Sequence, residues 1–255
     1  MGLNDILCPV GMEAVEMILQ NEKYKLQNMK FCEVKTPHFL VYLDQQNGRT
    51  TLSEYITEVY VKEKFRLFSK RDTLLEYELD GSVRQLNEIY ADLKYRYSGY
   101  MNKYNGVVAI SLEGLLRKNP REAEIPLFIK LMKEMKDDVT FVFFAPQNNT
   151  KSAELFSKIE KELVFVEKFS LSSYTVSQLS EIVKRVIEDK SVEIVGLETK
   201  YVIENLIMEE GITTAKAASF LGERLVKYAN VRNRDVYLEL NDNTLKKGLY
   251  KIGGK

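Results

Sequence analysis

The sequence predicts an α/β protein in two domains, a large three-layer domain with a parallel sheet over residues 1–170 and a small all-helical domain over residues 171–255. Two observations predict this fold class. Up to residue 170, short apolar runs alternate with amphipathic helical segments, which is typical of a parallel sheet covered on both faces. From Tyr174 to Tyr228 the apolar residues recur only at helical spacing.

The large domain is expected to begin with a helix and to contain four strands. Its strand segments are rich in branched and aromatic residues, and its helical segments carry one apolar face. The expected strands are 39–43, 65–68, 107–110 and 139–144. The expected helices are 4–27, a helix that starts at Gly48, 83–97 and 122–135, and residues 70–77 are expected to lead into a loop.

The small domain is expected to contain three amphipathic helices, over 176–188, 198–208 and 213–228. The stretch that follows is less regular. Residues 236–240 alternate like a strand, residues 243–251 have helical character, and the lysine-rich end is interpreted as a solvated tail.

The composition is that of an ordinary globular protein without net charge. The 37 basic residues balance 37 acidic residues, which counts against binding to nucleic acid or an anionic membrane through overall charge. Two cysteines and the single His38 give no disulfide framework and no zinc spacing, and His38 is assigned a structural role. Without a leader-like N-terminus or a long apolar stretch, the chain is predicted to be cytoplasmic.

Residues 36–56 have the pattern of a buried strand, a polar turn and the start of a helix. A strand that leads through a tight turn to a helix N-terminus is how a P-loop binds phosphate, because free N–H groups and the helix dipole face the anion. Against the pattern G-x-x-x-x-G-K-[ST], Gly48 and Thr50 are retained. Leu43 replaces the first glycine, Gln46 replaces a frequent mid-loop glycine, and Arg49 replaces the lysine.

The part of the motif that remains defines a candidate nucleotide site. Its candidate phosphate-binding residues are Asn47, Gly48, Arg49, Thr50 and Thr51, with ATP or ADP as the ligand and Mg²⁺ left open. The alternative is that Gly48 only shapes the strand-to-helix turn and that Thr50 and Thr51 are first-turn residues with no phosphate nearby. Both interpretations stay open.

Six further segments occur in an order that carries a family resemblance. They are VGM at 10–12, PHFL at 37–40, RDTLLEY at 71–77, GVVAI at 106–110, residues 122–138, and SYT at 173–175 with QL at 178–179. With them the chain resembles an AAA+ ATPase module, and more narrowly the group of the stage V sporulation protein K family and the red-type rubisco activases. The resemblance covers nearly the whole chain. It implies an adenine pocket at Val10 and Gly11, a helical lid, and assembly with a protein partner or with AAA+ copies.

The departures from this family fall on the residues that carry its chemistry. The resemblance places an Asp-Glu pair after the strand at 107–110, where the Asp holds Mg²⁺ and the Glu polarises the attacking water. This sequence has Ser111 and Leu112 at those positions. Glu113 follows one position later as a weak catalytic candidate. Because a one-residue shift at a strand end reverses the side-chain direction, Glu113 is expected to point away and is interpreted as an ordinary polar residue.

Other positions of the family carry lysine or tyrosine. The arginine-finger region contains Lys158 and Lys161, and the sensor arginine of the lid corresponds to Lys216. Lysine lacks the fork geometry by which arginine stabilises a transferring phosphoryl group, and the alternative is that all three are solvated charges. Tyr77 corresponds to the aromatic residue of a pore loop, and the alternative is that it packs under that loop.

These changes together favour a degenerate AAA+ protein, a pseudoenzyme that has weakened or lost ATP binding and hydrolysis and acts as an assembly or regulatory partner. One alternative is a divergent active ATPase that uses Arg49, Thr50 and either Glu113 or Asp44. Another is a nucleic-acid-associated, clamp-loader-like module, against which the neutral charge counts. Basic residues near the C-terminus keep it open, namely Lys227, Arg232, Arg234, Lys246, Lys247 and Lys251.

Overall fold

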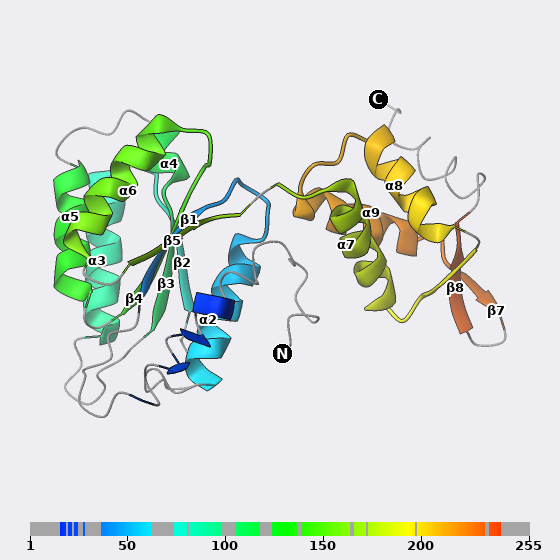
Figure 1. Cartoon of the computed structure of the whole chain (residues 1–255), viewed down its shortest axis with the longest axis horizontal. Coiled ribbons are helices and arrows are strands. Elements are labelled where there is room, and N and C mark those ends of the chain that lie inside the picture. The colour runs from blue at the N-terminus through cyan, green and yellow to red at the C-terminus, as the bar shows by residue number, and fades with distance from the viewer. Residues whose placement is uncertain are drawn as a thin grey trace. The chain divides into compact units, whose positions relative to one another are not determined.

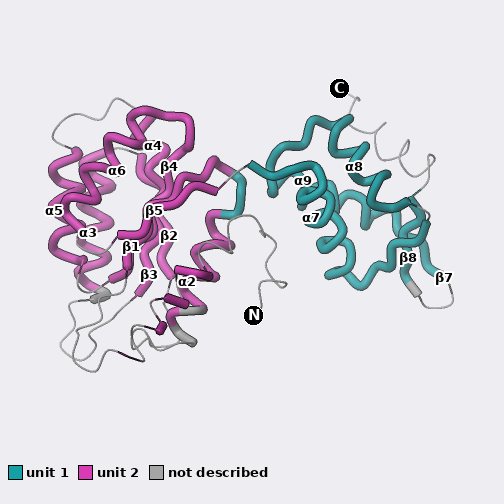
Figure 2. The backbone as a smooth tube through the Cα atoms, viewed as in Figure 1, with its two compact units in different colours: residues 1–10, 46–48, 172–255 teal, residues 11–45, 49–171 magenta. Residues whose placement is uncertain are grey.

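A computed structural model describes residues 16–18, 20–21, 23–24, 28, 37–62, 74–80, 82–97, 106–117, 124–136, 139–163, 166–171, 173–196, 198–232 and 235–240. The chain divides into two compact units (Figure 2). Unit 2 comprises residues 11–45 and 49–171, and unit 1 comprises residues 1–10, 46–48 and 172–255. Residues 46–48 therefore count with unit 1, although their neighbours in the chain on both sides count with unit 2.

Unit 2 contains a five-stranded sheet in the order β2-β3-β4-β1-β5, in which all neighbouring strands are parallel. This confirms the predicted α/β class with a parallel sheet. The strands are β1 (His38–Tyr42), β2 (Leu74–Glu78), β3 (Val107–Ser111), β4 (Thr140–Ala145) and β5 (Val166–Ser170). The helices are α2 (Arg49–Lys62), α3 (Val83–Tyr97), α4 (Glu113–Arg117), α5 (Glu124–Met135) and α6 (Thr150–Glu162).

The sheet is the middle of three layers. Every residue of β3 and β4 is buried, as the continuous apolar runs predict. Figure 1 shows α3, α5 and α6 on one face of the sheet and α2 on the other. A hydrophobic core cluster joins the α3, α5 and α6 side to the sheet through residues such as Leu93, Phe128, Phe143 and Phe156. In parallel sheets of this kind, ligands bind at the carboxyl ends of the strands, so that edge holds the candidate site.

Strand β2 was not predicted. The structure forms it at Leu74–Glu78, which overlaps residues 70–77, the segment expected to lead into a loop. As an edge strand β2 is only partly buried, and its polar residues Glu76 and Glu78 interrupt the apolar run that would have marked it. The strand expected over 65–68 lies outside the described residues. Of the helix expected over 4–27, the described residues 16–18, 20–21 and 23–24 are helical.

Unit 1 contains the three expected helices, α7 (Val176–Glu188), α8 (Thr199–Glu209) and α9 (Ala215–Val226). A capping box of Thr175 and Gln178 starts α7. The expectation of helices alone is incomplete, because unit 1 also contains a sheet in the order β6-β8-β7. Its strands are β6 (Glu193–Val195), β7 (Asn230–Arg232) and β8 (Asp235–Glu239). Strands of three residues are too short to show a period, whereas the alternation at 236–240 did indicate β8.

Within the described part of the chain, no helix is both long and apolar enough to cross a membrane.

Candidate functional site

The candidate site begins where β1 ends and the chain turns into α2. Leu43 continues the sheet by donating its N–H to the Ala145 carbonyl at 2.9 Å, and its side chain is buried in the core. Asp44 accepts a hydrogen bond from the Gln147 N–H at 3.2 Å. Gln46 and Gly48 have positive φ angles of 64° and 88°, so the turn keeps a tight left-handed bend although only one of its two left-handed residues is glycine.

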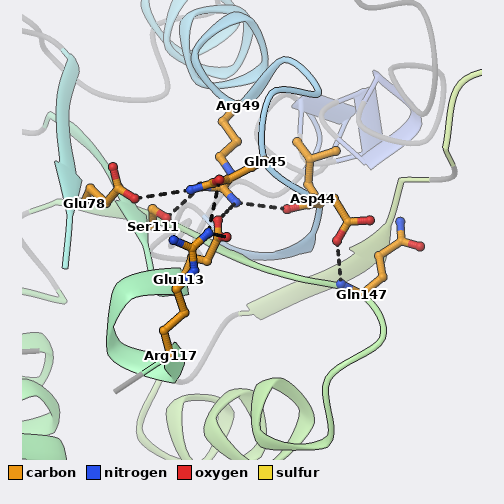
Figure 3. Close-up of polar contacts among 9 residues, drawn as sticks. Asp44, Gln45, Arg49, Glu78, Ser111, Glu113, Arg117 and Gln147 are labelled. Carbon is orange, nitrogen blue, oxygen red and sulfur yellow. Dashed lines mark hydrogen bonds and ion pairs between the residues drawn. The ribbon is translucent and has the colours of Figure 1, made fainter. Parts of the chain in front are cut away.

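Arg49, the first residue of α2, lies with its guanidinium among acceptors of its own chain (Figure 3). Its Nη1 donates to Ser111 Oγ at 2.7 Å, and its Nη2 donates to Glu113 Oε2 at 2.8 Å. The Leu43 carbonyl lies 3.5 Å from Nη2. The two charged side chains are 16% and 12% exposed, so the ion pair is largely shielded from water. The Arg49 Nε is buried and has no hydrogen-bond partner among the described residues.

Glu113 points toward Arg49, and the expectation that it points away is wrong. The alternation of side chains holds only within a strand, and β3 ends at Ser111. Leu112 is buried, and Glu113 then opens α4, whose first turn directs the carboxylate back to the end of the sheet. Gly114 permits this path, since a Cβ at that position would lie 2.0 Å from the Leu79 carbonyl oxygen.

A second arginine, which sequence reasoning missed, completes the cluster. Arg117 lies one turn after Glu113 on α4 and pairs with its other carboxylate oxygen (Figure 3). Arg117 also donates to the Gln45 side chain at 3.2 Å, and Gln45 in turn donates to Glu78 at 3.5 Å. The i,i+4 spacing of Glu113 and Arg117 was the sequence signal that could have found this pair.

The threonines of the motif lie in the first turn of α2, where Thr50 Oγ1 donates to Glu76 Oε2 at 3.4 Å. The hydroxyl at the Mg²⁺-binding position of a P-loop is thus directed at a carboxylate on β2. Thr51 is partly exposed in the same turn. The side chains of Arg49 and Thr50 are therefore both engaged by partners within unit 2.

The loop residues 46–48 make their described contacts within unit 1. The N–H of Lys216 donates to the Gln46 carbonyl at 3.0 Å, and the N–H of Ala215 donates to Asn47 Oδ1 at 3.4 Å. Thr214 caps the next N–H of α9, that of Ala217, at 3.3 Å. The Tyr174 hydroxyl donates to the Asn47 carbonyl at 3.3 Å. The first three N–H groups of α9, which a helix leaves without intrahelical partners, thus all have acceptors.

The remaining predicted residues lie apart from this cluster. Tyr77 is part of β2 and donates its hydroxyl to Asp92 on α3 at 2.6 Å. The side chain of Lys216 is exposed in the first turn of α9, and Lys158 and Lys161 are exposed on α6. His38 accepts the Phe141 N–H through Nδ1 at 3.0 Å and continues the sheet hydrogen bonding. Val10 and Gly11 lie outside the described residues, as do Arg234, Lys246, Lys247 and Lys251.

The arrangement limits the chemistry that the site can perform. The positions that would hold Mg²⁺ and polarise water are a serine whose hydroxyl accepts from Arg49 and a leucine in the core. The carboxylate of Glu113 is bound on both oxygens by guanidinium groups, so it is not free to act as a base. The cation at the lysine position is already paired.

A parallel sheet in the order β2-β3-β4-β1-β5, with the turn of a P-loop after β1, defines the AAA+ type of P-loop fold. Comparison with solved structures bears this out. The chain is similar to the RuvB Holliday junction branch migration motor of Thermotoga maritima, with a TM-score of 0.58 and 17% identity over 95% of this chain and 70% of that one. It is also similar to the ORC2 protein of Aeropyrum pernix, with a TM-score of 0.58 and 14% identity over 95% of this chain and 68% of that one.

At these identities the likeness shows the fold alone. No family model matches the chain, and no curated protein matches it.

Proposed function

We propose that the chain is a degenerate AAA+ ATPase-like protein in which ATP binding and hydrolysis are weakened or lost, and which acts as an assembly or regulatory partner of other protein chains. The observation that carries this proposal is the pairing of Arg49 with Glu113 and Ser111 at 2.8 and 2.7 Å. The cation that would meet a phosphate is instead neutralised by a carboxylate of the same unit.

The pairing opposes nucleotide binding in free-energy terms. A phosphate at Arg49 would have to displace Glu113, and hydrogen bonds to charged groups contribute about 1.5–3 kcal/mol each. The displaced carboxylate, only 12% exposed, would keep only Arg117 as a partner, and an incompletely paired shielded charge costs several kcal/mol. Glu76 and Glu78 add two further negative charges at the same end of the sheet.

Hydrolysis is opposed by the residues at the end of β3. Ser111 and Leu112 provide no carboxylate for Mg²⁺ or for the attacking water. Without that metal ligand we expect a loss of several kcal/mol of transition-state stabilisation, which lowers the rate by about 10³ or more at about 1.4 kcal/mol per decade. ATP or ADP is therefore at most a weak ligand of this protein, and positions 111 and 112 offer Mg²⁺ no carboxylate.

The narrower family and the partner belong to the same proposal. The sequence resemblance supports a place near the stage V sporulation protein K and red-type rubisco activase group, in a cytoplasmic homo- or hetero-oligomer. The alternative of a divergent ATPase using Asp44 or Glu113 is disfavoured because both carboxylates already accept hydrogen bonds. A nucleic-acid-associated role is the second candidate, since the fold is similar to that of a Holliday junction motor despite the neutral charge of this chain.

Calorimetric titration of the purified chain with ATP and with ADP, with and without Mg²⁺ at about 0.15 M salt, tests the proposal. We expect no detectable heat at millimolar nucleotide, which corresponds to a binding free energy weaker than about −4 kcal/mol. Micromolar, Mg²⁺-dependent binding that disappears in Arg49→Ala would contradict the proposal and favour the divergent ATPase. Binding to a branched DNA that collapses between low and moderate salt would favour the nucleic-acid role.

A further inference from the structure

We propose that Glu113 occupies the anion position of a latent phosphate-binding site, and that this residue sets the protein's selectivity against polyphosphate ligands. The inference rests on the proposed function and deepens it, because it assigns the exclusion of nucleotide to one carboxylate. The ligand class of the latent site is the polyphosphate chain of a nucleotide or an inorganic polyphosphate.

The donors around Glu113 are those that a phosphate would use. The guanidinium of Arg49 binds one carboxylate oxygen at 2.8 Å, and the guanidinium of Arg117 binds the other. Arginine recognises carboxylate and phosphate by the same planar fork of N–H groups, so one anion can replace the other. Arg49 also keeps a buried Nε donor without a partner among the described residues, which a tetrahedral anion with more oxygens has the capacity to satisfy.

The carboxylate of Glu113 is the anionic partner of the first residue of α2. The first turn of α2 contains no acidic residue of its own, and Arg49 at its first position pairs with Glu113 of α4. Glu113 therefore supplies from α4 a negative charge to the side chain that a phosphate would meet.

Glu113 is fixed in this position by the fold. It opens α4, Gly114 lets that helix approach the Leu79 carbonyl, and Arg117 holds the carboxylate from the next turn. Its 12% exposure contrasts with the exposed ion pair of Arg84 and Glu88, whose side chains are 88% and 61% exposed. A fixed, shielded anion competes with phosphate far more strongly than a surface carboxylate does.

The test compares four variants with the wild-type chain. Glu113→Ala and Glu113→Gln remove the internal anion. Glu78→Gln is the matched control, since it removes one negative charge from the same end of the sheet while leaving Arg49 paired. The double variant Arg49→Ala with Glu113→Ala removes both partners. Each folded variant is titrated calorimetrically at low salt with inorganic tripolyphosphate and with ATP, and circular dichroism checks folding.

We expect Glu113→Ala and Glu113→Gln to bind tripolyphosphate at least tenfold more tightly than the wild-type chain. The control Glu78→Gln and the double variant are expected to show no such gain. A stronger gain with ATP than with tripolyphosphate would identify a nucleotide site, and equal gains would identify a general polyphosphate site.

Two results would overturn the inference. One is a folded Glu113→Gln variant with no gain in affinity, and the other is an equal gain in Glu78→Gln, which would trace the effect to net charge. Micromolar ATP binding by the wild-type chain would instead refute the proposed function. The ratio of the dissociation constants of the Glu113 variants and the wild-type chain would still decide the role of Glu113.

Discussion

If Arg49 occupies the lysine position of a P-loop, as proposed above, its side chain selects a different partner from the one a lysine would take. A lysine ammonium is a compact charge, whereas the guanidinium is a planar fork that can donate to two acceptors at once. In this protein one branch of the fork meets Ser111 and the other meets Glu113. Arg49, Ser111 and Glu113 therefore form one connected interaction.

A second residue, Tyr55 on α2, gives the protein a predicted pH dependence. Burial, together with the nearby charge and hydrogen bond of Glu16, raises the pKa of Tyr55 from 10.0 to about 12. The folded environment favours the neutral phenol of Tyr55, and the unfolded chain does not. The resulting contribution to the free energy of unfolding is complete below about pH 10 and is lost as the pH rises toward 12.

We therefore expect the free energy of unfolding of the wild-type chain to fall more steeply between about pH 10 and pH 12 than that of Tyr55→Phe. Urea denaturation of both proteins across this range measures the difference. The comparison isolates the contribution of Tyr55, because the other 14 of the 15 tyrosines are common to both proteins. Equal slopes would show that Tyr55 does not ionise differently on unfolding.

Sequence reasoning found part of the site, including Arg49, Ser111 and Glu113, but it missed Arg117 and the geometry. Arg49, Ser111 and Leu112 were recognisable because each departs from a fixed position of a motif. The direction of the Glu113 side chain could not be recognised in this way, because it depends on the residue at which β3 ends. An apolar run such as Val107 to Leu112 does not show whether its last residue belongs to the strand or to the turn. Gln45 follows β1, whereas Glu76 and Glu78 belong to β2, and only the pairing of the strands in the sheet brings these residues together.

At the scale of elements, α4 is the short helix that places Glu113 and Arg117 at the end of the sheet. A helix of five residues has little stability of its own, so its position depends on the close contact of Gly114 with the end of β2. The contact is between backbones, and a side chain there meets the Leu79 carbonyl, which is not free to rotate away. The geometry of the site therefore depends on a residue without a side chain.

We expect Gly114→Ala to lower the free energy of unfolding by about 3 kcal/mol, because the added methyl group must displace α4 or β2. Urea denaturation measures this loss. The control is Gly211→Ala, where φ is +62° and no atom of the described residues lies within 4 Å of the added Cβ, so only backbone strain of about 1 kcal/mol is expected. Losses of similar size in the two variants would show that the contact at Gly114 is not tight.

At the scale of the whole molecule, the buried part of the sheet was predictable and its edges were not. β1, β3 and β4 lie in the interior of the sheet and consist of nearly continuous apolar residues. β2 and β5 are the edge strands, are partly exposed, and mix polar with apolar residues. A strand that is buried on both faces has a continuous run of apolar residues, which the sequence shows clearly. A partly exposed edge strand has no such run.

Asn47 connects distant parts of the sequence in unit 1, since its side chain accepts the N–H of Ala215, 168 positions later. We expect Asn47→Ala to lower the free energy of unfolding by about 1 kcal/mol, as the loss of a helix cap does, although Asn47 belongs to the P-loop turn. Thr214→Ala, which removes the N-cap of the same helix, is the matched comparison. An unchanged stability for Asn47→Ala alone would contradict this role, and thermal denaturation measures both variants.

Residues 46–48 supply hydrogen-bond acceptors to the first N–H groups of α9, and this limits where the chain can be cut or fused to another protein. The chain enters unit 1 for three residues, returns to unit 2 for more than a hundred, and enters unit 1 again at residue 172. Unit 1 is therefore discontinuous in the gene. A fragment that encodes 172–255 alone lacks two acceptors for the start of α9, so a truncation or gene fusion at residue 171 transfers an incomplete unit.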